Sequence, residues 1–222
     1  MDEKLLFKIG SKINVCGSSG SGKTYWLAKY LTEIDRRFDE IIWITNELSA
    51  EQELIKELKK KLGVKFVVRI GMGDEEGLKA DLFDNKDDKI KTAVVFDDLM
   101  MEQNKFLAEL FLAGRHLGIT IFQLVQSIFT GSKQCRNMAQ NVQYYVLFNF
   151  PDALSICELA RRLTTSKKDK EAVVQAWKDA TSKKGGCLII DLITSQSDLQ
   201  DAKLLKWRDT EMNYIYKSLE SV

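Results

Sequence analysis

The stretch from Gly17 to Thr24 combines residue types at a spacing that suits the binding of phosphate. It fits the pattern G-x-x-x-x-G-K-[S/T] at every fixed position and reads Gly17-Ser18-Ser19-Gly20-Ser21-Gly22-Lys23-Thr24. Small residues let backbone N–H groups approach phosphate oxygens, and a following helix directs its positive end at the same anion. Lys23 adds a charge for the β- and γ-phosphates, and the Thr24 hydroxyl can ligate Mg²⁺. These eight residues therefore predict a binding site for ATP.

Two adjacent carboxylates follow a strand expected over Thr92–Phe96. Asp97 would hold Mg²⁺, directly or through a water, and Asp98 would polarise the attacking water, with Glu102 as the next candidate for that base. The alternative is that the two acids cap the following helix. The 73 positions from Thr24 to Asp97 leave room for two βα units. That spacing favours NTPases with an additional strand between the phosphate-loop strand and the acid-bearing strand.

Gln126 ends the next expected strand, Ile119–Gln126. An amide at the carboxyl end of a strand beside the γ-phosphate can sense that phosphate and position water. A loop-facing amide without this role is the alternative. Arg115 precedes the same strand by a short turn, where its simplest role is a surface salt bridge.

The elements that must position these residues alternate buried strands with helices. Further strands are expected over Lys12–Cys16, Glu40–Thr45, Val64–Ile70, Val142–Phe150 and Cys187–Leu192, and helices over Tyr25–Leu31, Ser49–Leu62, Glu102–Ala113, Ala153–Leu163 and Lys170–Thr181. This alternation predicts an α/β fold with a mostly parallel central sheet flanked by helices. We expect residues 1–198 to form the nucleotide-binding domain and residues 199–222 an amphipathic tail packed on it or on a neighbouring subunit.

Two stretches carry no chemistry of this kind. Leu5–Ile9 is expected as an edge strand, and the acidic stretch Asp74–Lys89 as a solvated helix or loop.

Composition limits the classes of partner. The formal net charge is +1 over 222 residues, so any contact with nucleic acid must come from a local basic patch. No apolar run approaches the roughly 20 residues of a membrane span. The four cysteines are far apart in the sequence, which favours free thiols in a reducing compartment over a zinc site.

Three stretches together resemble one family in their order and spacing: Gly17–Thr24, Val94–Leu99, and Gly114–Thr120 running on to Gln126. They resemble the genome-packaging ATPases of large double-stranded DNA viruses, the poxvirus-type branch of the FtsK/HerA superfamily, which also occurs in virophages and polinton-like elements. The resemblance covers about Lys12 to Phe150. It implies a RecA-like P-loop NTPase of the additional-strand type that uses ATP and Mg²⁺ to thread duplex DNA into a capsid.

The resemblance also implies partners and a residue role. It implies a homo-oligomeric ring, a capsid vertex or portal-like partner, and action in the host cytoplasm, the viral factory or the virion. The arginine before the Gln-bearing strand acts in the neighbour's site in this family, which carries over to Arg115. Much of the superfamily has Asp-Glu where this chain has Asp97-Asp98, and the shorter second side chain reaches one methylene less far.

Two basic segments are candidates for sequence-independent contact with DNA phosphates. The stretch Arg161–Lys184 contains Lys167, Lys168 and Lys170, and the loop after the Gln-bearing strand contains Lys133 and Arg136. For any single lysine, a solvated helix face is the simpler interpretation.

Two other functions remain open from the sequence. A P-loop kinase of a small molecule would show an Arg-rich lid and an acceptor pocket, neither of which is clear. A nucleotide-dependent virion assembly protein would bind ATP with little turnover and no stimulation by DNA.

Overall fold

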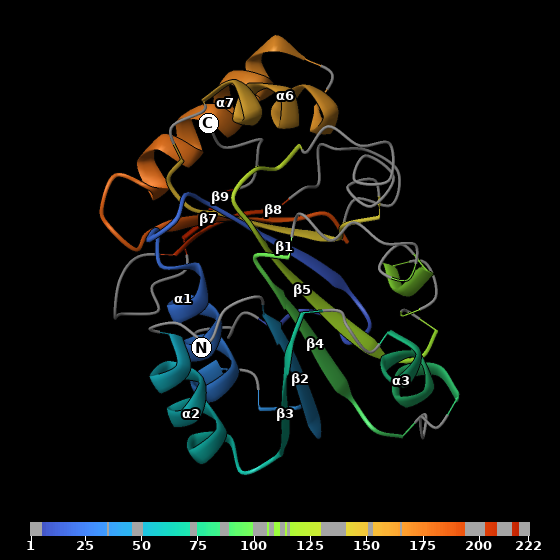
Figure 1. Cartoon of the computed structure of the whole chain (residues 1–222). Coiled ribbons are helices and arrows are strands. Elements are labelled where there is room, and N and C mark those ends of the chain that lie inside the picture. The colour runs from blue at the N-terminus through green and yellow to red at the C-terminus, as the bar shows by residue number, and fades with distance from the viewer. Residues whose placement is uncertain are drawn as a thin grey trace.

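A computed structural model describes residues 6–34, 36–45, 51–71, 75–84, 89–99, 106, 109–111, 114, 116–129, 141–150, 153–164, 166–193, 203–207 and 215–217. Within these ranges nine strands form one sheet, in the order β3-β2-β4-β5-β1-β6-β7-β8-β9 (Figure 1). The strands are β1 (Lys12–Cys16), β2 (Glu40–Thr45), β3 (Lys65–Ile70), β4 (Thr92–Asp97), β5 (Ile119–Val125), β6 (Tyr144–Leu147), β7 (Cys187–Asp191), β8 (Lys203–Trp207) and β9 (Ile215–Lys217).

The six strands from β3 to β6 in this order are parallel, and β7, β8 and β9 extend the sheet in antiparallel fashion. β5 lies between the acid-bearing β4 and the phosphate-loop strand β1. The additional-strand α/β fold expected from the sequence is therefore confirmed. β1 and β4 are buried along their whole length and β5 at all but one residue, as expected for parallel strands covered on both faces.

Helices cover both faces of the sheet (Figure 1). They are α1 (Lys23–Lys29), α2 (Glu51–Leu62), α3 (Glu75–Lys79), α6 (Ala153–Leu163) and α7 (Lys167–Ala180), with π-helical turns at Tyr30–Ile34 after α1 and at Ala80–Asp84 after α3. One core joins the sheet to α1 and α2, and the other joins it to α3, α6 and α7. The expected helix Glu102–Ala113 lies largely outside the described residues.

α7 begins three residues earlier than the sequence pattern predicted. The Ser166 side chain accepts a hydrogen bond from the Asp169 backbone N–H at 3.0 Å and caps the helix there. The first turn therefore includes Lys167 and Lys168, and the expected start at Lys170 was wrong.

The prediction of an edge strand at Leu5–Ile9 was also wrong for the part that the structure describes, residues 6–9. Phe7 is only 1% exposed and packs among aromatic rings, with its ring centroid 4.9 Å from that of Tyr30 and 4.6 Å from that of Tyr144. A buried aromatic side chain, and no strand pairing, holds this segment on the domain.

The acidic stretch Asp74–Lys89 is less solvated than its charge suggested. Leu78 and Leu82 lie four residues apart, on one side of α3 and its π-helical turn, and both are buried in the core. Their apolar surface anchors the segment in spite of its acidic residues.

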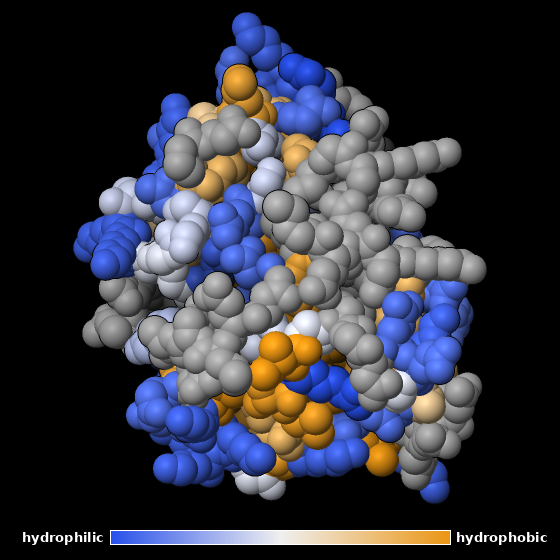
Figure 2. All heavy atoms as spheres, in the orientation of Figure 1, coloured by the Kyte–Doolittle hydropathy of each residue, from blue (hydrophilic) through white to orange (hydrophobic). Residues whose placement is uncertain are grey.

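β3 forms one edge of the described sheet, and β9 forms the other. Val68 and Ile70 on β3 are exposed, and Figure 2 shows apolar side chains gathered low in the view, where β3 lies in Figure 1. On the same strand Lys65 pairs with Glu40 and Arg69 pairs with Asp81, each at 2.6 Å. Every helix within the described ranges is too short or too polar to traverse a lipid bilayer.

Candidate nucleotide-binding site

The phosphate loop begins where β1 ends and is anchored to two neighbouring strands. The Gly17 N–H donates to the Val125 carbonyl at the end of β5, at 3.1 Å. The Ser18 N–H and hydroxyl both donate to the Asn149 carbonyl just beyond β6, at 3.3 and 3.2 Å. The loop is therefore held at the carboxyl edge of the sheet, where ligands bind in parallel α/β folds.

The loop is shaped as a cradle with little room for side chains. A methyl group at Gly17 would lie 2.6 Å from both the Phe148 Cβ and the Ser21 hydroxyl oxygen. That hydroxyl oxygen is buried and has no hydrogen-bond partner among the residues that the structure describes. Gly22, with φ of 99°, adopts a left-handed conformation that suits glycine and leads directly into α1. A compact loop that ends in a helix, with an unsatisfied hydroxyl inside, fits a bound phosphate.

Lys23 is folded over this loop. Its ammonium group donates to the Gly17 carbonyl at 2.8 Å and to the Ser18 carbonyl at 3.0 Å, and the residue is 9% exposed. The lysine is therefore held at the start of the loop, where its charge can meet phosphate oxygens after a small movement of a flexible side chain.

Asp97 is the last residue of β4 and is 4% exposed. Its carboxylate accepts a hydrogen bond from the Trp43 indole N–H on the adjacent β2, at 3.3 Å. A buried carboxylate is costly unless it is hydrogen-bonded or paired. The indole contact orients one oxygen of this group.

Asp98 turns away from the strand with a left-handed backbone, φ 54°. Its N–H donates to the Leu124 carbonyl of β5 at 3.3 Å, and its carboxylate accepts a hydrogen bond from the Gln126 side-chain amide at 2.7 Å. Among residues with a side chain, Asp and Asn tolerate this backbone region best. The backbone thus gives a physical reason for an Asp at this position.

These contacts bring three separate parts of the sequence together. Consecutive carbonyls at the end of β5 accept hydrogen bonds from the acid pair and from the phosphate loop: Leu124 from Asp98, and Val125 from Gly17. Gln126 follows directly and reaches Asp98. The loop, the acids and the amide therefore form one site at the carboxyl ends of β4, β5 and β1 (Figure 1).

The donors at this site fit Mg²⁺. The ion usually keeps several waters and takes only one or two protein ligands together with substrate phosphates. A hydroxyl at Thr24 and the buried carboxylate of Asp97 are ligands of that kind. No cluster of three or more His, Cys, Asp or Glu side chains suited to a metal occurs in the described part of the chain, so an all-protein metal cage is not built there.

Two buried cysteines, Cys16 before the phosphate loop and Cys187 on β7, have thiols with a raised pKa. Burial raises the pKa of the Cys16 thiol, and the nearby Lys23 lowers it by less. Burial likewise raises the pKa of the Cys187 thiol. Both groups stay protonated near neutral pH, so neither is a nucleophile.

Other predicted residues lie elsewhere. Lys167, Lys168 and Lys170 lie on the first turn of α7, where Lys167 is 3.9 Å from Glu171 and both side chains are largely exposed. The structure brings none of the three into the site above. Four further candidates lie outside the described residues: Arg115, Lys133, Arg136 and Glu102.

Sequence reasoning missed three residues that build this site. Trp43 holds Asp97, Asn149 anchors Ser18, and the Trp177 indole of α7 donates to the Phe148 carbonyl at 3.0 Å beside the loop. The Asn149 contact gave no signal, because its acceptor is a backbone carbonyl that any residue would supply. Trp43 lies within an apolar strand and Trp177 on the buried face of an amphipathic helix, and neither carried a signal.

Solved structures with a similar fold include viral packaging enzymes. The genome packaging NTPase B204 from Sulfolobus turreted icosahedral virus 2, in complex with sulfate, matches with a TM-score of 0.59 and 17% identity over 89% of this chain and 96% of that chain. Its complex with ATP-gammaS gives the same TM-score and identity over 89% and 98%. The pCW3 conjugation coupling protein TcpA matches with a TM-score of 0.51 and 14% identity over 98% of this chain and 62% of that chain. At these identities the likeness concerns the fold.

Sequence comparison gives the family. No curated protein matches the chain closely enough to count as a relative. The family described as "Poxvirus A32 protein" matches residues 2–204, which include every described element of the site. The chain therefore belongs to the poxvirus A32 protein family, as the order and spacing of its motifs predicted.

Proposed function

We propose that this chain is an ATP-hydrolysing translocase that packages a double-stranded DNA genome into a preformed capsid, acting as a homo-oligomeric ring. One observation carries the enzymatic part: the β5 carbonyls of Leu124 and Val125 bind the acid pair and the phosphate loop side by side. Membership of the poxvirus A32 family and the printed titles of the B204 structures support the packaging part.

In the proposed reaction a water attacks the γ-phosphorus, and the bond to the oxygen that bridges the β- and γ-phosphates breaks. The Asp98 carboxylate takes one proton of this water. The Gln126 amide donates a hydrogen bond to the same carboxylate and holds the carboxylate in place. Lys23 exchanges the Gly17 and Ser18 carbonyls for phosphate oxygens and stabilises the charge that develops. Mg²⁺ bound through Thr24 and Asp97 would neutralise phosphate charge.

Arg115 is proposed to act in the site of the neighbouring subunit. A guanidinium suits this role because its planar fork donates to two oxygens at once and stays charged. Fingers of this kind accelerate hydrolysis by about 10³–10⁵ in P-loop enzymes. Arg115→Ala should therefore bind ATP and assemble but hydrolyse slowly. Mixing it with Lys23→Ala subunits should restore part of the activity, because some boundaries then pair an intact loop with an intact arginine.

We propose that DNA is held through its phosphates by Lys167, Lys168 and Lys170, with Lys133 and Arg136 as the second candidates. Replacing the three α7 lysines with alanine should lower the affinity for duplex DNA and reduce its dependence on salt, while the basal ATPase rate is preserved. The matched control is Lys56, Lys59 and Lys60 of α2, which are exposed and carry the same total charge as the three α7 lysines. An unchanged salt dependence in the α7 variant would move the role to Lys133 and Arg136, or remove it.

The test of the function is the ATPase rate with and without duplex DNA, measured together with the mass of the assembly. A DNA-stimulated rate in a ring is the expected result. Phosphate transfer to a small-molecule acceptor would indicate a kinase, and tight ATP binding with little turnover and no effect of DNA would indicate an assembly protein. A capsid vertex or portal-like partner, and action in the host cytoplasm, the viral factory or the virion, belong to the same proposal.

A further inference from the structure

A pocket of about 280 Å³ adjoins the phosphate loop on the side away from the acid pair. It is lined by residues 18–21 of the loop, by Asn149 after β6, and by the turn from residue 181 to residue 186 between α7 and β7. Figure 1 shows this turn leading from α7 into β7, next to the end of β6. Four loop residues thus line both the phosphate cradle and the pocket.

The far wall of the pocket is a well-fixed turn. The Thr181 hydroxyl donates to the Trp177 carbonyl at 2.8 Å, and the Ser182 hydroxyl donates to the Asp179 carbonyl at 2.7 Å. A methyl group at Gly186 would lie 2.3 Å from the Ala180 carbonyl oxygen, so the turn packs tightly onto the end of α7. Each hydroxyl has its proton engaged and keeps oxygen lone pairs that accept from a ligand O–H or N–H.

The charge of the wall suits an anionic ligand. Lys183 and Lys184 line the pocket and are both exposed, and neither forms an ion pair with another residue that the structure describes. Asn149 also lines the pocket, and an asparagine amide offers both a donor and an acceptor. Lysines whose charge is not neutralised, beside a loop that fits phosphate, add attraction for a polyphosphate ligand.

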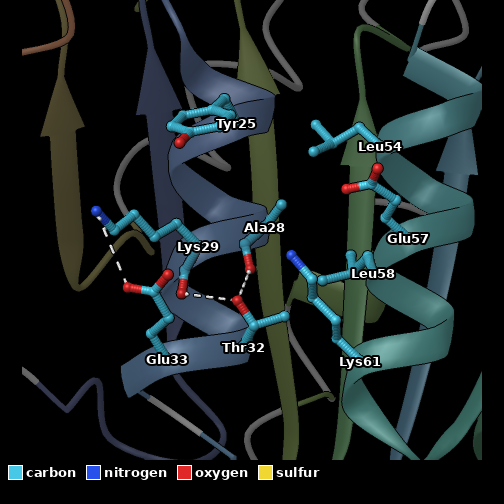
Figure 3. Close-up of a pocket in the computed structure, with 9 residues that line it drawn as sticks. All are labelled: Tyr25, Ala28, Lys29, Thr32, Glu33, Leu54, Glu57, Leu58 and Lys61. Atoms are coloured by element: carbon cyan, nitrogen blue, oxygen red, sulfur yellow. Dashed lines mark hydrogen bonds and ion pairs between the residues drawn. The ribbon is translucent and has the colours of Figure 1, made fainter. Parts of the chain in front are cut away.

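A second hollow of about 230 Å³ does not have these properties. It lies between α1 and α2, where Figure 3 shows Tyr25, Leu54 and Leu58 along its walls. Its charged groups are of both signs, and Lys29 already pairs with Glu33 at 3.9 Å. None of residues 17–24 lines it.

We propose that the pocket between the phosphate loop and the α7–β7 turn takes the nucleoside end of the bound nucleoside triphosphate. Lys183 and Lys184 attract this anionic ligand through their positive charge. This inference rests on the proposed function, because it requires the triphosphate to lie in the loop. The volume of the pocket, about 280 Å³, is near the lower end of the range for small-ligand pockets, about 300–1,000 Å³. This is the size expected for a pocket that takes only part of a nucleotide. The two lysines are thereby separated from the proposed DNA contacts at the other end of α7.

The test compares two ligands by titration calorimetry: ATPγS, which would fill loop and pocket, and tripolyphosphate, which would fill the loop alone. Ser182→Phe adds bulk at an exposed position of the pocket wall. We expect this variant to bind ATPγS at least tenfold more weakly than wild type and tripolyphosphate within about twofold of wild type. Gln175→Phe, an exposed position of α7 outside the pocket, is the control and should bind both normally.

A second variant, Lys183→Ala with Lys184→Ala, needs no added bulk. It should weaken ATPγS and leave the affinity for duplex DNA unchanged, while the control Lys59→Ala with Lys60→Ala on α2 alters neither. Normal ATPγS binding by both pocket variants, or a loss of DNA affinity without a loss of ATPγS affinity, would overturn the inference. A wild-type protein that binds neither ATPγS nor tripolyphosphate would instead overturn the proposed function.

Discussion

Substitution of Gly17 by alanine tests the geometry of the phosphate loop. The added methyl would lie 2.6 Å from the Phe148 Cβ and 2.6 Å from the Ser21 hydroxyl oxygen, whereas ordinary contacts begin at 3.4 Å. The loop and the end of β6 must therefore separate by roughly 0.8 Å, in an interior that is close-packed. The Phe148 Cβ is attached to the backbone and cannot swing aside, so the loop has to move.

Two magnitudes follow from this displacement. Overpacking of a tight site costs about 1–3 kcal/mol of folding stability. A shift approaching 1 Å in a positioning group costs about 10²-fold in function. We therefore expect Gly17→Ala to lower the free energy of unfolding by about 1–3 kcal/mol and to weaken ATPγS binding by about 10²-fold.

Urea unfolding and calorimetric titration of ATPγS measure the two effects separately. Gly63→Ala is the matched control: Gly63 has φ of 65° and open space around its Cα, so alanine there costs backbone strain of about 1–2 kcal/mol without touching the site. Adding Ser21→Ala to Gly17→Ala should restore binding only in part, since the contact with Phe148 remains. If Gly17→Ala bound ATPγS as wild type does at unchanged stability, the described loop geometry would be refuted.

Three further outcomes are expected. Lys23→Ala should abolish ATP turnover, since it loses charge stabilisation on the order of several kcal/mol, and phosphate release near the wild-type rate would contradict its role. Asp98→Asn keeps the shape and the left-handed backbone, so ATPγS should bind within about threefold while kcat falls by about 10²–10⁴; normal turnover would place the base elsewhere. Burial raises the pKa of Tyr144 to about 12, so the stability from this neutral phenol is complete below its unfolded value of about 10 and is lost as pH rises through 12. In urea unfolding at pH 9 and 11.5, Tyr144→Phe should lose less stability than wild type, and the exposed control Tyr25→Phe as much as wild type; an equal loss in Tyr144→Phe would refute the assignment.

The parts of the site that were predictable are those in which a local pattern determines position. The position of the loop between β1 and α1 could be predicted because its residue types and spacing form a local pattern. That Asp97, Asp98 and Gln126 lie close to the loop could be predicted because parallel strands bring their carboxyl ends to one edge. The separation of 73 positions along the sequence between Thr24 and Asp97 indicated the additional strand. No local pattern gives the order of the strands in the sheet.

The parts that were not predictable depend on contacts between distant residues. The Trp43–Asp97 and Trp177–Phe148 hydrogen bonds join residues 54 and 29 positions apart. Trp43 belongs to an apolar strand and Trp177 to the buried face of an amphipathic helix, patterns that any packed element would show. Charge content also misled at Leu78 and Leu82, because a few buried leucines outweigh many exposed acids in deciding whether a segment packs.

The central claim, movement along DNA driven by ATP hydrolysis, is tested most directly by displacement of a triplex-forming strand from a duplex track. A third strand bound at one end of linear duplex DNA can be removed by a motor that travels along the duplex. We predict displacement that requires ATP and assembled wild-type protein, and none with Lys23→Ala. ATP hydrolysis stimulated by DNA without displacement, in assemblies shown to be intact, would contradict the account.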